Sequence, residues 1–331
     1  MKSLKLGWLL LFLAALGCLL AGSLLLGRTA ISWSTMLDAF RQYDESNAKQ
    51  LIVRTERLDR AVIAATTGAA LAVAGALMQA LTRNPLASPS VFGINSGAIL
   101  FVVLGTLLLD IHDMSQLMWL GFAGAALTAL CVYMLGAVGS DGMTPMKLVM
   151  AGAAMTALFA SMTQIILVMD DTGFQDVIFW LSGSVSGRSL DSLLPVLPFL
   201  VAALMAAFLM SGAINVLITG EDIARGLGQR TTIVKIAMGL TVVVLAGGSV
   251  GVVGSIGFVG LVVPHLARAF TGNDYRWLIP ISAVMGADLL LLADIGARFL
   301  IMPQEVPIGI MMAMIGVPFF VYIARRGVIR D

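Results

Sequence analysis

The sequence predicts an all-helical protein that crosses a membrane about ten times. Apolar residues make up 59% of the chain and charged residues 12%, whereas roughly a quarter of a soluble domain is charged. The apolar residues fall into stretches close to the ~20 residues that one helical crossing needs. Both observations indicate a single polytopic membrane domain over residues 1–331.

The predicted spans cover residues 7–27, 58–82, 91–109, 116–138, 146–169, 192–211, 231–250, 252–270, 278–300 and 306–324. In the first span, Lys2 and Lys5 precede a leucine-rich run, as they would in a signal peptide. The length of this run, and the absence of a small-x-small cleavage site before Arg28, favour an uncleaved helix.

The basic residues give the orientation of these spans. If the chain starts inside, the inner side carries Lys2, Lys5, Arg83, Lys147, Arg225, Arg230, Lys235, Arg268, Arg276, Arg325, Arg326 and Arg330. The outer side is richer in acids, among them Asp44, Glu45, Asp110, Asp113 and Asp191. By the positive-inside rule, both termini are predicted to be cytoplasmic, with the chain in the cytoplasmic (inner) membrane.

Arginines at the outer side are an exception to this rule. Arg57 and Arg60 lie just before the second span, and Arg298 lies near the outer end of the ninth. A cationic patch facing outward would suit an anionic partner. Alternatively, the nearby acids neutralise it as interfacial ion pairs, and these acids are Glu56, Asp59 and Glu305.

The second and third spans are joined by a polar turn. Asn84 and Pro85 are good helix stops, and the third span opens with Asn95, Ser96 and Gly97. Small and polar residues at a helix start could line a pathway or allow close helix packing. The residues alone leave both interpretations open.

Residues 214–230 form the longest predicted inner segment, with the sequence INVLITGEDIARGLGQR. The pattern predicts two short helices broken at Gly220. Glu221 and Asp222 would then lie in the first turn of the second helix, where the helix dipole favours acids, and Gly226 or Gly228 could end it. The segment is interpreted either as a docking element for a cytoplasmic partner or as a connector on the membrane surface.

The stretch from Ser255 to Arg268 predicts a helix that leaves the bilayer. Gly257 and Gly260 would let another helix approach closely. Pro264, His265 and Arg268 are costly in hydrocarbon and belong at its polar edge.

Two aspartates, Asp288 and Asp294, are predicted within the ninth span. Ionisable groups at membrane depth are costly and usually functional, which raises an ion-coupled secondary transporter as an alternative function. Asp294 is four residues before Arg298, a spacing suited to an ion pair on one helix. Asp288 has no evident partner in the sequence.

The sequence lacks the residue clusters of an enzyme. His112 and His265 fall on opposite sides of the predicted topology, and the two cysteines, Cys18 and Cys131, lie in apolar spans. No lysine follows a glycine, which excludes a GxxxxGK[ST] phosphate loop. No cofactor, metal or nucleic-acid partner is expected, and any ATP hydrolysis must come from a separate chain.

Six motifs occur in order along the chain. They are RLDR at 57–60, GAALAVAGALMQALTRNPLASPSVFGINSGA at 68–98, FWLSGS at 179–184, GFVGLVVPHLAR at 257–268, GADLLLLADIGAR at 286–298 and VPIGIMMAMIGVPFF at 306–320. Together they closely resemble the FecCD family of permeases, which import ferric siderophores, haem and vitamin B12 as parts of ABC transporters. The resemblance covers residues 50–324, nearly the whole chain.

The resemblance implies the type II ABC importer permease fold. It also implies a pair of permeases, either two copies or two related chains, with two cytoplasmic ATPase subunits and an outer substrate-binding protein. Ferric siderophore is the commonest cargo of the family, with haem or cobalamin as the alternative. The chain departs from the family pattern at Asp59, where proline is usual, and at Asp288, where the family is usually apolar.

The resemblance also implies two sets of site residues. Arg57, Arg60 and Arg298 match arginines that face acids on the binding protein. The residues matching the coupling helices, which sit in a groove of the ATPase, are Glu221, Asp222, Ala224, Leu227 and Gly228.

Overall fold

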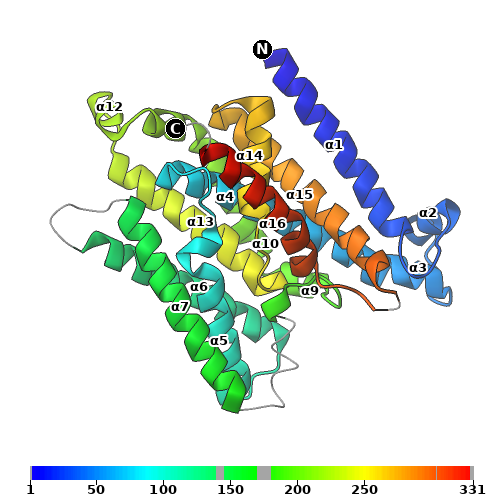
Figure 1. Cartoon of the computed structure of the whole chain (residues 1–331). Helices are drawn as coiled ribbons and strands as arrows, with labels where there is room; N and C mark the ends of the chain where they lie inside the picture. The colour runs from blue at the N-terminus through cyan, green and yellow to red at the C-terminus, as the bar shows by residue number, and fades with distance from the viewer. Residues whose placement is uncertain (1, 139–144, 170–179, 303, 329–331) are drawn as a thin grey trace.

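The computed structural model describes residues 2–138, 145–169, 180–302 and 304–328, and helices dominate throughout them. The chain begins with α1 (Lys2–Leu25), α2 (Trp33–Arg41) and α3 (Ala48–Ile52). A π-helical turn over Val53–Arg57 then leads without a break into α4 (Leu58–Thr82). Figure 1 shows α2 and α3 beside the far end of α1, at one edge of the bundle.

The middle of the chain forms the next layer of helices. A short 3-10 turn at Pro89–Phe92 precedes α5 (Ile94–Leu108), α6 (Met114–Ala137) and α7 (Pro145–Met169). After residue 180 come α9 (Leu190–Leu193), α10 (Leu197–Leu209), α11 (Ser211–Ile218) and α12 (Glu221–Gly226). The last part of the chain holds α13 (Thr231–Val253), α14 (Val259–Thr271), α15 (Tyr275–Leu300) and α16 (Ile308–Val328).

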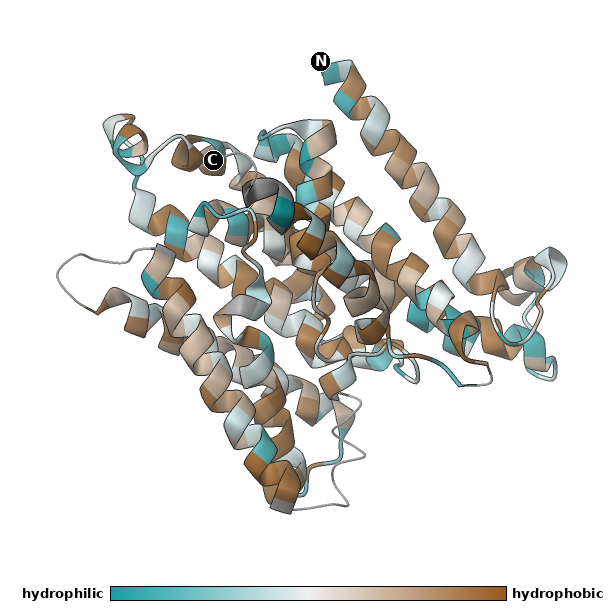
Figure 2. Ribbon diagram, in the orientation of Figure 1, coloured by the Kyte–Doolittle hydropathy of each residue, from teal (hydrophilic) through white to brown (hydrophobic). Residues whose placement is uncertain are grey.

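Each of the ten predicted spans contains a helix. Among the described residues, six helices are long and apolar enough to cross a membrane. A seventh span results if α10 and α11, bent by 52°, count as one, whereas α5, α14 and the apolar part of α16 are shorter. An all-helical membrane fold is therefore confirmed, and the number of ten crossings stays a prediction. Apolar residues dominate along the helices, while polar residues gather at their ends and connections (Figure 2).

Helix α4 lies at the centre of the bundle and packs on α13, α14 and α15. Glycines make this possible, because a Cβ added to Gly75 would lie 1.9 Å from the Gly260 carbonyl oxygen of α14. A Cβ added to Gly68 would lie 2.3 Å from the Gly286 carbonyl oxygen of α15. The backbones touch at these crossings, as small residues allow in membrane bundles.

The predicted helix over residues 252–270 is wrong at its start. The backbone from Gly254 to Phe258 is not helical, and both of these residues have positive φ, 76° and 67°. A distant segment of the chain stabilises this break, because the Ser255 N–H donates to the Trp180 carbonyl oxygen at 3.0 Å. The helix begins only at Val259, so Pro264 lies inside it and not at its end.

Candidate functional site

The end of the bundle that is predicted to lie outside contains a buried cluster of charges centred on Asp294. One Asp294 oxygen accepts from Arg60 at 2.7 Å, and the other accepts from Arg298. Arg60 also pairs with Glu305 at 2.7 Å, and Ser186 donates to the same Glu305 oxygen at 2.8 Å. The cluster therefore joins α4, α15 and the segment that leads into α16.

Two arginines of this region also hold the end of α1. Arg298 donates to the carbonyl oxygens of Ser23 and Leu26 at 2.7 and 2.8 Å, and to the Ser23 hydroxyl at 2.8 Å. Arg57 donates to the Leu24 carbonyl at 2.8 Å and to the Thr29 carbonyl. These carbonyls lie at or just beyond the C-terminus of α1, where backbone oxygens lack helical partners.

The structure brings Arg57, Arg60 and Arg298 to one end of the bundle, but it does not expose them. Their exposed fractions are 4%, 3% and 3%. Their contacts favour the alternative of internal neutralisation, since Arg60 pairs with Glu305 and Asp294. Docking through these three arginines stays a prediction.

Asp59, which stands where the family usually has proline, does not pair with Arg60. Its carboxylate accepts from the Leu190 N–H at 3.0 Å, which ties the start of α4 to α9.

Glu305 is the member of this cluster that reaches the surface, because its side chain is 20% exposed. Burial alone would raise the pKa of Glu305, but attraction and hydrogen bonding from Arg60 outweigh burial and lower it. The Glu305 carboxylate therefore stays ionised at neutral pH.

At the opposite end, α11 and α12 form the predicted helix pair, and the break falls at Gly220 as predicted. Gly220 has φ 138° and Gly228 has φ 80°, and both conformations suit glycine. Ala224 is buried, whereas Ile223 and Leu227 are 56% and 71% exposed. The short helix therefore presents apolar side chains outward at the end of the bundle, where Figure 1 shows it projecting.

Glu221 fixes this projecting helix to α13. Its carboxylate accepts from Lys235 at 2.6 Å and from Arg225 at 2.8 Å. The Lys235 hydrogen bond is the main reason that the pKa of Glu221 is lowered. The sequence predicts Lys235 only as an inner positive charge, because a spacing of fourteen residues from Glu221 gives no sign of the pair.

Among the predicted pathway or packing residues, several make packing contacts. The Asn95 amide donates to the Ser255 hydroxyl at 3.1 Å and so joins α5 to the break before α14. A Cβ on Gly97 would lie 1.7 Å from the Thr128 hydroxyl oxygen. Gly260 packs on α4 as described above, whereas a Cβ on Gly257 would meet nothing within 4 Å.

The remaining predicted residues lie in less confined places. Asn84 and Pro85 are exposed, and the Asn84 side chain accepts from the Leu86 N–H at 2.9 Å, which closes the turn after α4. Ser96 is half-buried in the first turn of α5.

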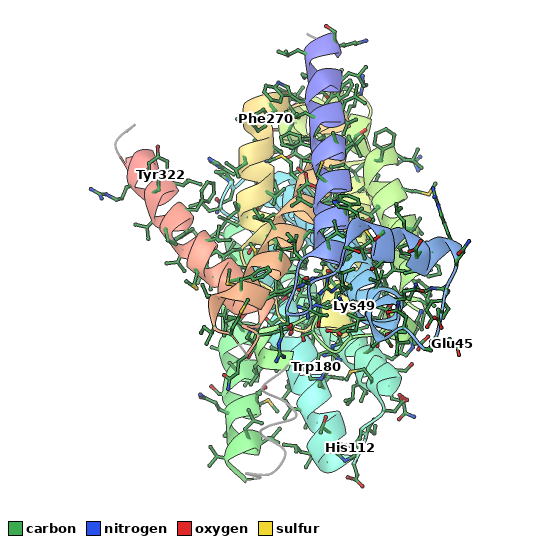
Figure 3. All side chains as sticks on the ribbon, turned by 90° about the vertical axis from the view of Figure 1, so that its right-hand side faces the viewer. Glu45, Lys49, His112, Trp180, Phe270 and Tyr322 are labelled. Carbon is green, nitrogen blue, oxygen red and sulfur yellow. The ribbon has the colours of Figure 1, made fainter. Side chains whose placement is uncertain are left out.

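Pro264 is buried inside α14, and His265 is half-buried with its ring edge-on to Phe319 at 5.8 Å. Figure 3 shows His112 at one end of the bundle and Phe270 at the other. Phe270 lies near the C-terminus of α14, the helix that also carries His265.

The two aspartates of α15 differ sharply in their surroundings. Asp294 is fully buried between two arginines, as the spacing to Arg298 predicted. Both carboxylate oxygens of Asp288 are also buried, but neither has a hydrogen-bond partner in the described part of the chain.

Comparison with known proteins adds three findings. Residues 11–326 match the FecCD transport family. The chain is 52% identical to the "Probable siderophore transport system permease protein YfiZ" of Bacillus subtilis, covering 92% of this chain and 91% of that one. It is 43% identical to the Fe(3+)-citrate import system permease protein YfmD of the same organism, covering 96% and 93%.

A solved structure also aligns with the fold. It is described as an inward-facing conformation of a metal-chelate type ABC transporter, with a TM-score of 0.83 and 26% sequence identity. The alignment covers 97% of this chain and 99% of the other.

Proposed function

The chain belongs to the FecCD transport family, and we propose that it is the membrane permease of an ATP-driven importer that carries an iron–siderophore complex into the cytoplasm. The observation that carries this proposal is the 52% identity to a relative named as a siderophore transport permease. As a member of this transport family, the chain is a transport subunit and not an enzyme.

The projecting helix α12 is the proposed contact with the ATPase. Two ATPase subunits would bind the inner end of a permease pair, one at each coupling segment. Ile223 and Leu227 are exposed apolar side chains on a helix that Glu221 and Lys235 fix to α13. A helix that is anchored at its base can transmit a displacement caused by a partner to the rest of the bundle. Asp222, Ala224 and Gly228 complete the proposed coupling segment.

A substrate-binding protein is proposed to dock at the outer end. In the described chain, Arg57, Arg60 and Arg298 are occupied by internal partners. Three arginines against the two carboxylates Asp294 and Glu305 leave this cluster with one net positive charge, and that excess charge would attract acids of the binding protein. The arginines would then contribute both to the outward charge and to the rigidity of the docking surface.

Transport would proceed by alternating access, in which ATP binding and hydrolysis exchange outward-open and inward-open states of the permease pair. The orientation proposed is the one given by the basic residues, with α12 and both termini in the cytoplasm. This orientation puts the Asp294 cluster on the outside.

The names of the relatives indicate the cargo. Relatives are named for siderophore, citrate and hydroxamate complexes of iron, so an iron complex is the proposed cargo. Cobalamin and haem remain alternatives within the family. Ion-coupled transport is less favoured, because Asp294 is held between two arginines, which leaves only Asp288 to carry an ion.

The test is uptake of radiolabelled iron, supplied as a panel of ferric siderophores, in cells with and without this chain under iron limitation. Loss of uptake for one class of siderophore, restored by the intact gene, would support the proposal. Unchanged uptake across the panel would contradict the iron cargo and direct the same assay to cobalamin and haem.

A further inference from the structure

Helices α6 and α13 pack closely in one half of their length and separate in the other. A Cβ on Gly251 of α13 would lie 2.9 Å from the Met118 carbonyl oxygen of α6, and a Cβ on Gly247 would lie 2.9 Å from the Ala125 side chain. Beyond these contacts, towards the end that carries α12, Leu130 and Tyr133 of α6 and Ile236 and Leu240 of α13 line an open space. The space between them is a groove of about 420 Å³, closed at the back by α4 and α7.

The deeper part of this groove is apolar. Ala126 and Leu130 of α6 face Gly239, Leu240 and Val243 of α13 across it. Leu130 and Leu240 are 52% and 63% exposed, so the groove is open at the surface of two helices that are long and apolar enough to span a membrane. An open apolar groove at membrane depth is a place for an acyl chain, because water gains no hydrogen bonds there.

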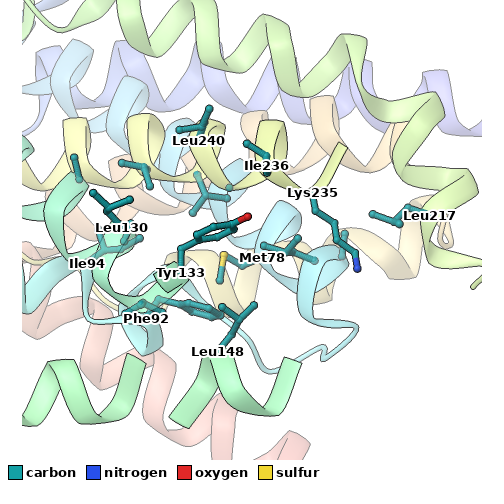
Figure 4. A pocket seen from close by; sticks show the side chains of 18 of the residues that line it. Met78, Phe92, Ile94, Leu130, Tyr133, Leu148, Leu217, Lys235, Ile236 and Leu240 are labelled. Carbon is teal, nitrogen blue, oxygen red and sulfur yellow. The ribbon is translucent and has the colours of Figure 1, made fainter. Parts of the chain in front are cut away.

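The shallower end of the groove is polar and carries more positive than negative charge. Its charged lining residues are Arg83, Lys235 and Glu221, two cations and one anion. Figure 4 shows Tyr133 reaching from α6 towards Ile236 of α13, with Lys235 farther along the same groove beside Leu217. Tyr133 lies one turn before the end of α6, and Lys235 lies one turn after the start of α13, which is the depth of lipid headgroups.

We propose that this groove binds one membrane phospholipid with an anionic headgroup. Its phosphate would lie at Lys235, Arg83 and the Tyr133 hydroxyl, and one acyl chain would lie along Leu130 and Leu240. Basic pockets between spanning helices on the cytoplasmic side recognise anionic lipids in this way. The inference rests on the proposed function only through the orientation that puts α12 in the cytoplasm.

The site also touches the coupling segment. Lys235 binds Glu221 at 2.6 Å, and Arg83 donates to the Leu217 carbonyl at 3.3 Å, so a bound phosphate shares its cations with α11 and α12. A phospholipid bound in the groove would therefore stabilise the base of α12, the helix that is proposed to contact the ATPase.

The test measures lipid retention by the purified full-length chain. The chain is placed in nanodiscs of equal phosphatidylglycerol and phosphatidylcholine, released in mild detergent and examined by native mass spectrometry. We expect one phosphatidylglycerol to be retained, in about fivefold preference to phosphatidylcholine. Equal retention of the two lipids would overturn the proposal.

Two glycine variants test the place of binding. A Cβ on Gly239, which lines the groove, meets nothing within 4 Å, and the same holds for Gly17 on α1. Gly239→Leu adds side-chain volume to the groove from a position where the Cβ has free space, and it should lower phosphatidylglycerol retention at least about fivefold. Gly17→Leu should behave as the unmodified chain. Equal retention by the two variants would overturn the proposed location.

Two charge variants distinguish direct binding of the lipid by Lys235 from an indirect effect of breaking the Glu221–Lys235 ion pair. Lys235→Gln should lower the preference for phosphatidylglycerol, whereas Glu221→Gln should raise it, each by about fivefold. Loss of the Glu221–Lys235 pair alone would move both variants in the same direction, and that result would overturn the proposal. The assay needs neither cargo nor ATPase, so its outcome is independent of the transport assignment.

Discussion

Arg60 of α4 and Asp294 of α15 form a buried ion pair at 2.7 Å, although 234 residues separate them in the chain. The pair connects the central helix to the helix with which it makes its most extensive contact. Arg298 occupies the other oxygen of Asp294 and holds the end of α1. One carboxylate therefore connects three helices, α1, α4 and α15, at the end of the bundle opposite α12.

The first prediction concerns this carboxylate. Asp294→Asn should destabilise the chain by about 3 kcal/mol, because removing one charge leaves the buried Arg298 without its counter-ion and leaves Arg60 with Glu305 alone. Thermal unfolding in detergent, followed by size-exclusion chromatography, measures the effect. Asp288→Asn is the matched control, since it makes the same change on the same helix. Equal melting temperatures for the two variants would contradict the structural role of Asp294.

Asp288 supports a second prediction, about coupling. Its buried oxygens have no hydrogen-bond partner among the described residues, and an isolated charge at this depth is costly. Asp288→Asn should therefore retain ATP-driven uptake and equal or exceed the original chain in stability. Loss of uptake by a stable, correctly assembled variant would instead favour ion-coupled transport.

The third prediction tests the close crossing of α4 and α14. A Cβ at Gly75 would lie 1.9 Å from the Gly260 carbonyl oxygen, so Gly75→Ala must push two backbones apart. We expect a loss of about 2–3 kcal/mol, the upper range for overpacking a core, visible as a lower melting temperature. Gly17→Ala adds the same methyl group to α1 where a Cβ meets nothing within 4 Å, and it should leave the melting temperature unchanged.

A fourth prediction concerns α12 as the ATPase contact. Leu227→Ala removes a side chain that is 71% exposed, so the fold of the permease should be unaffected. If α12 meets the ATPase, this variant should weaken copurification of the ATPase subunit by about tenfold or more, which corresponds to at least ~1.4 kcal/mol of binding free energy. Leu209→Ala, at a leucine 78% exposed on α10, is the control. An equal yield of ATPase with both variants would argue against α12.

Local patterns in the sequence predicted much of this fold. Each apolar stretch contains a helix, the break at Gly220 is where glycine and the acidic pair indicated it, and the Asp294–Arg298 pair follows from four-residue spacing. These features depend on neighbours along one helix or turn, which the sequence displays directly.

Features that depend on distant partners were missed or wrong. The backbone before α14 is non-helical because Ser255 bonds to Trp180 in another segment, and no local pattern reveals that contact. For the arginines predicted to lie outside, the sequence left docking and internal pairing open; their internal partners come from α1, α15 and residue 305, and docking to a partner stays a prediction. Whether a charged side chain is buried depends on the tertiary structure, so the spacing of residues in the sequence does not predict it.

Reconstitution in liposomes measures whether this chain takes part in the ATP-driven import of an iron complex. The chain, its permease partner and ATPase subunits are placed in liposomes, with binding protein and labelled ferric siderophore on the side opposite the ATPases. The proposed function predicts accumulation that requires both ATP and the binding protein and persists when ion gradients are collapsed. Accumulation that follows a proton or sodium gradient without ATP would contradict it.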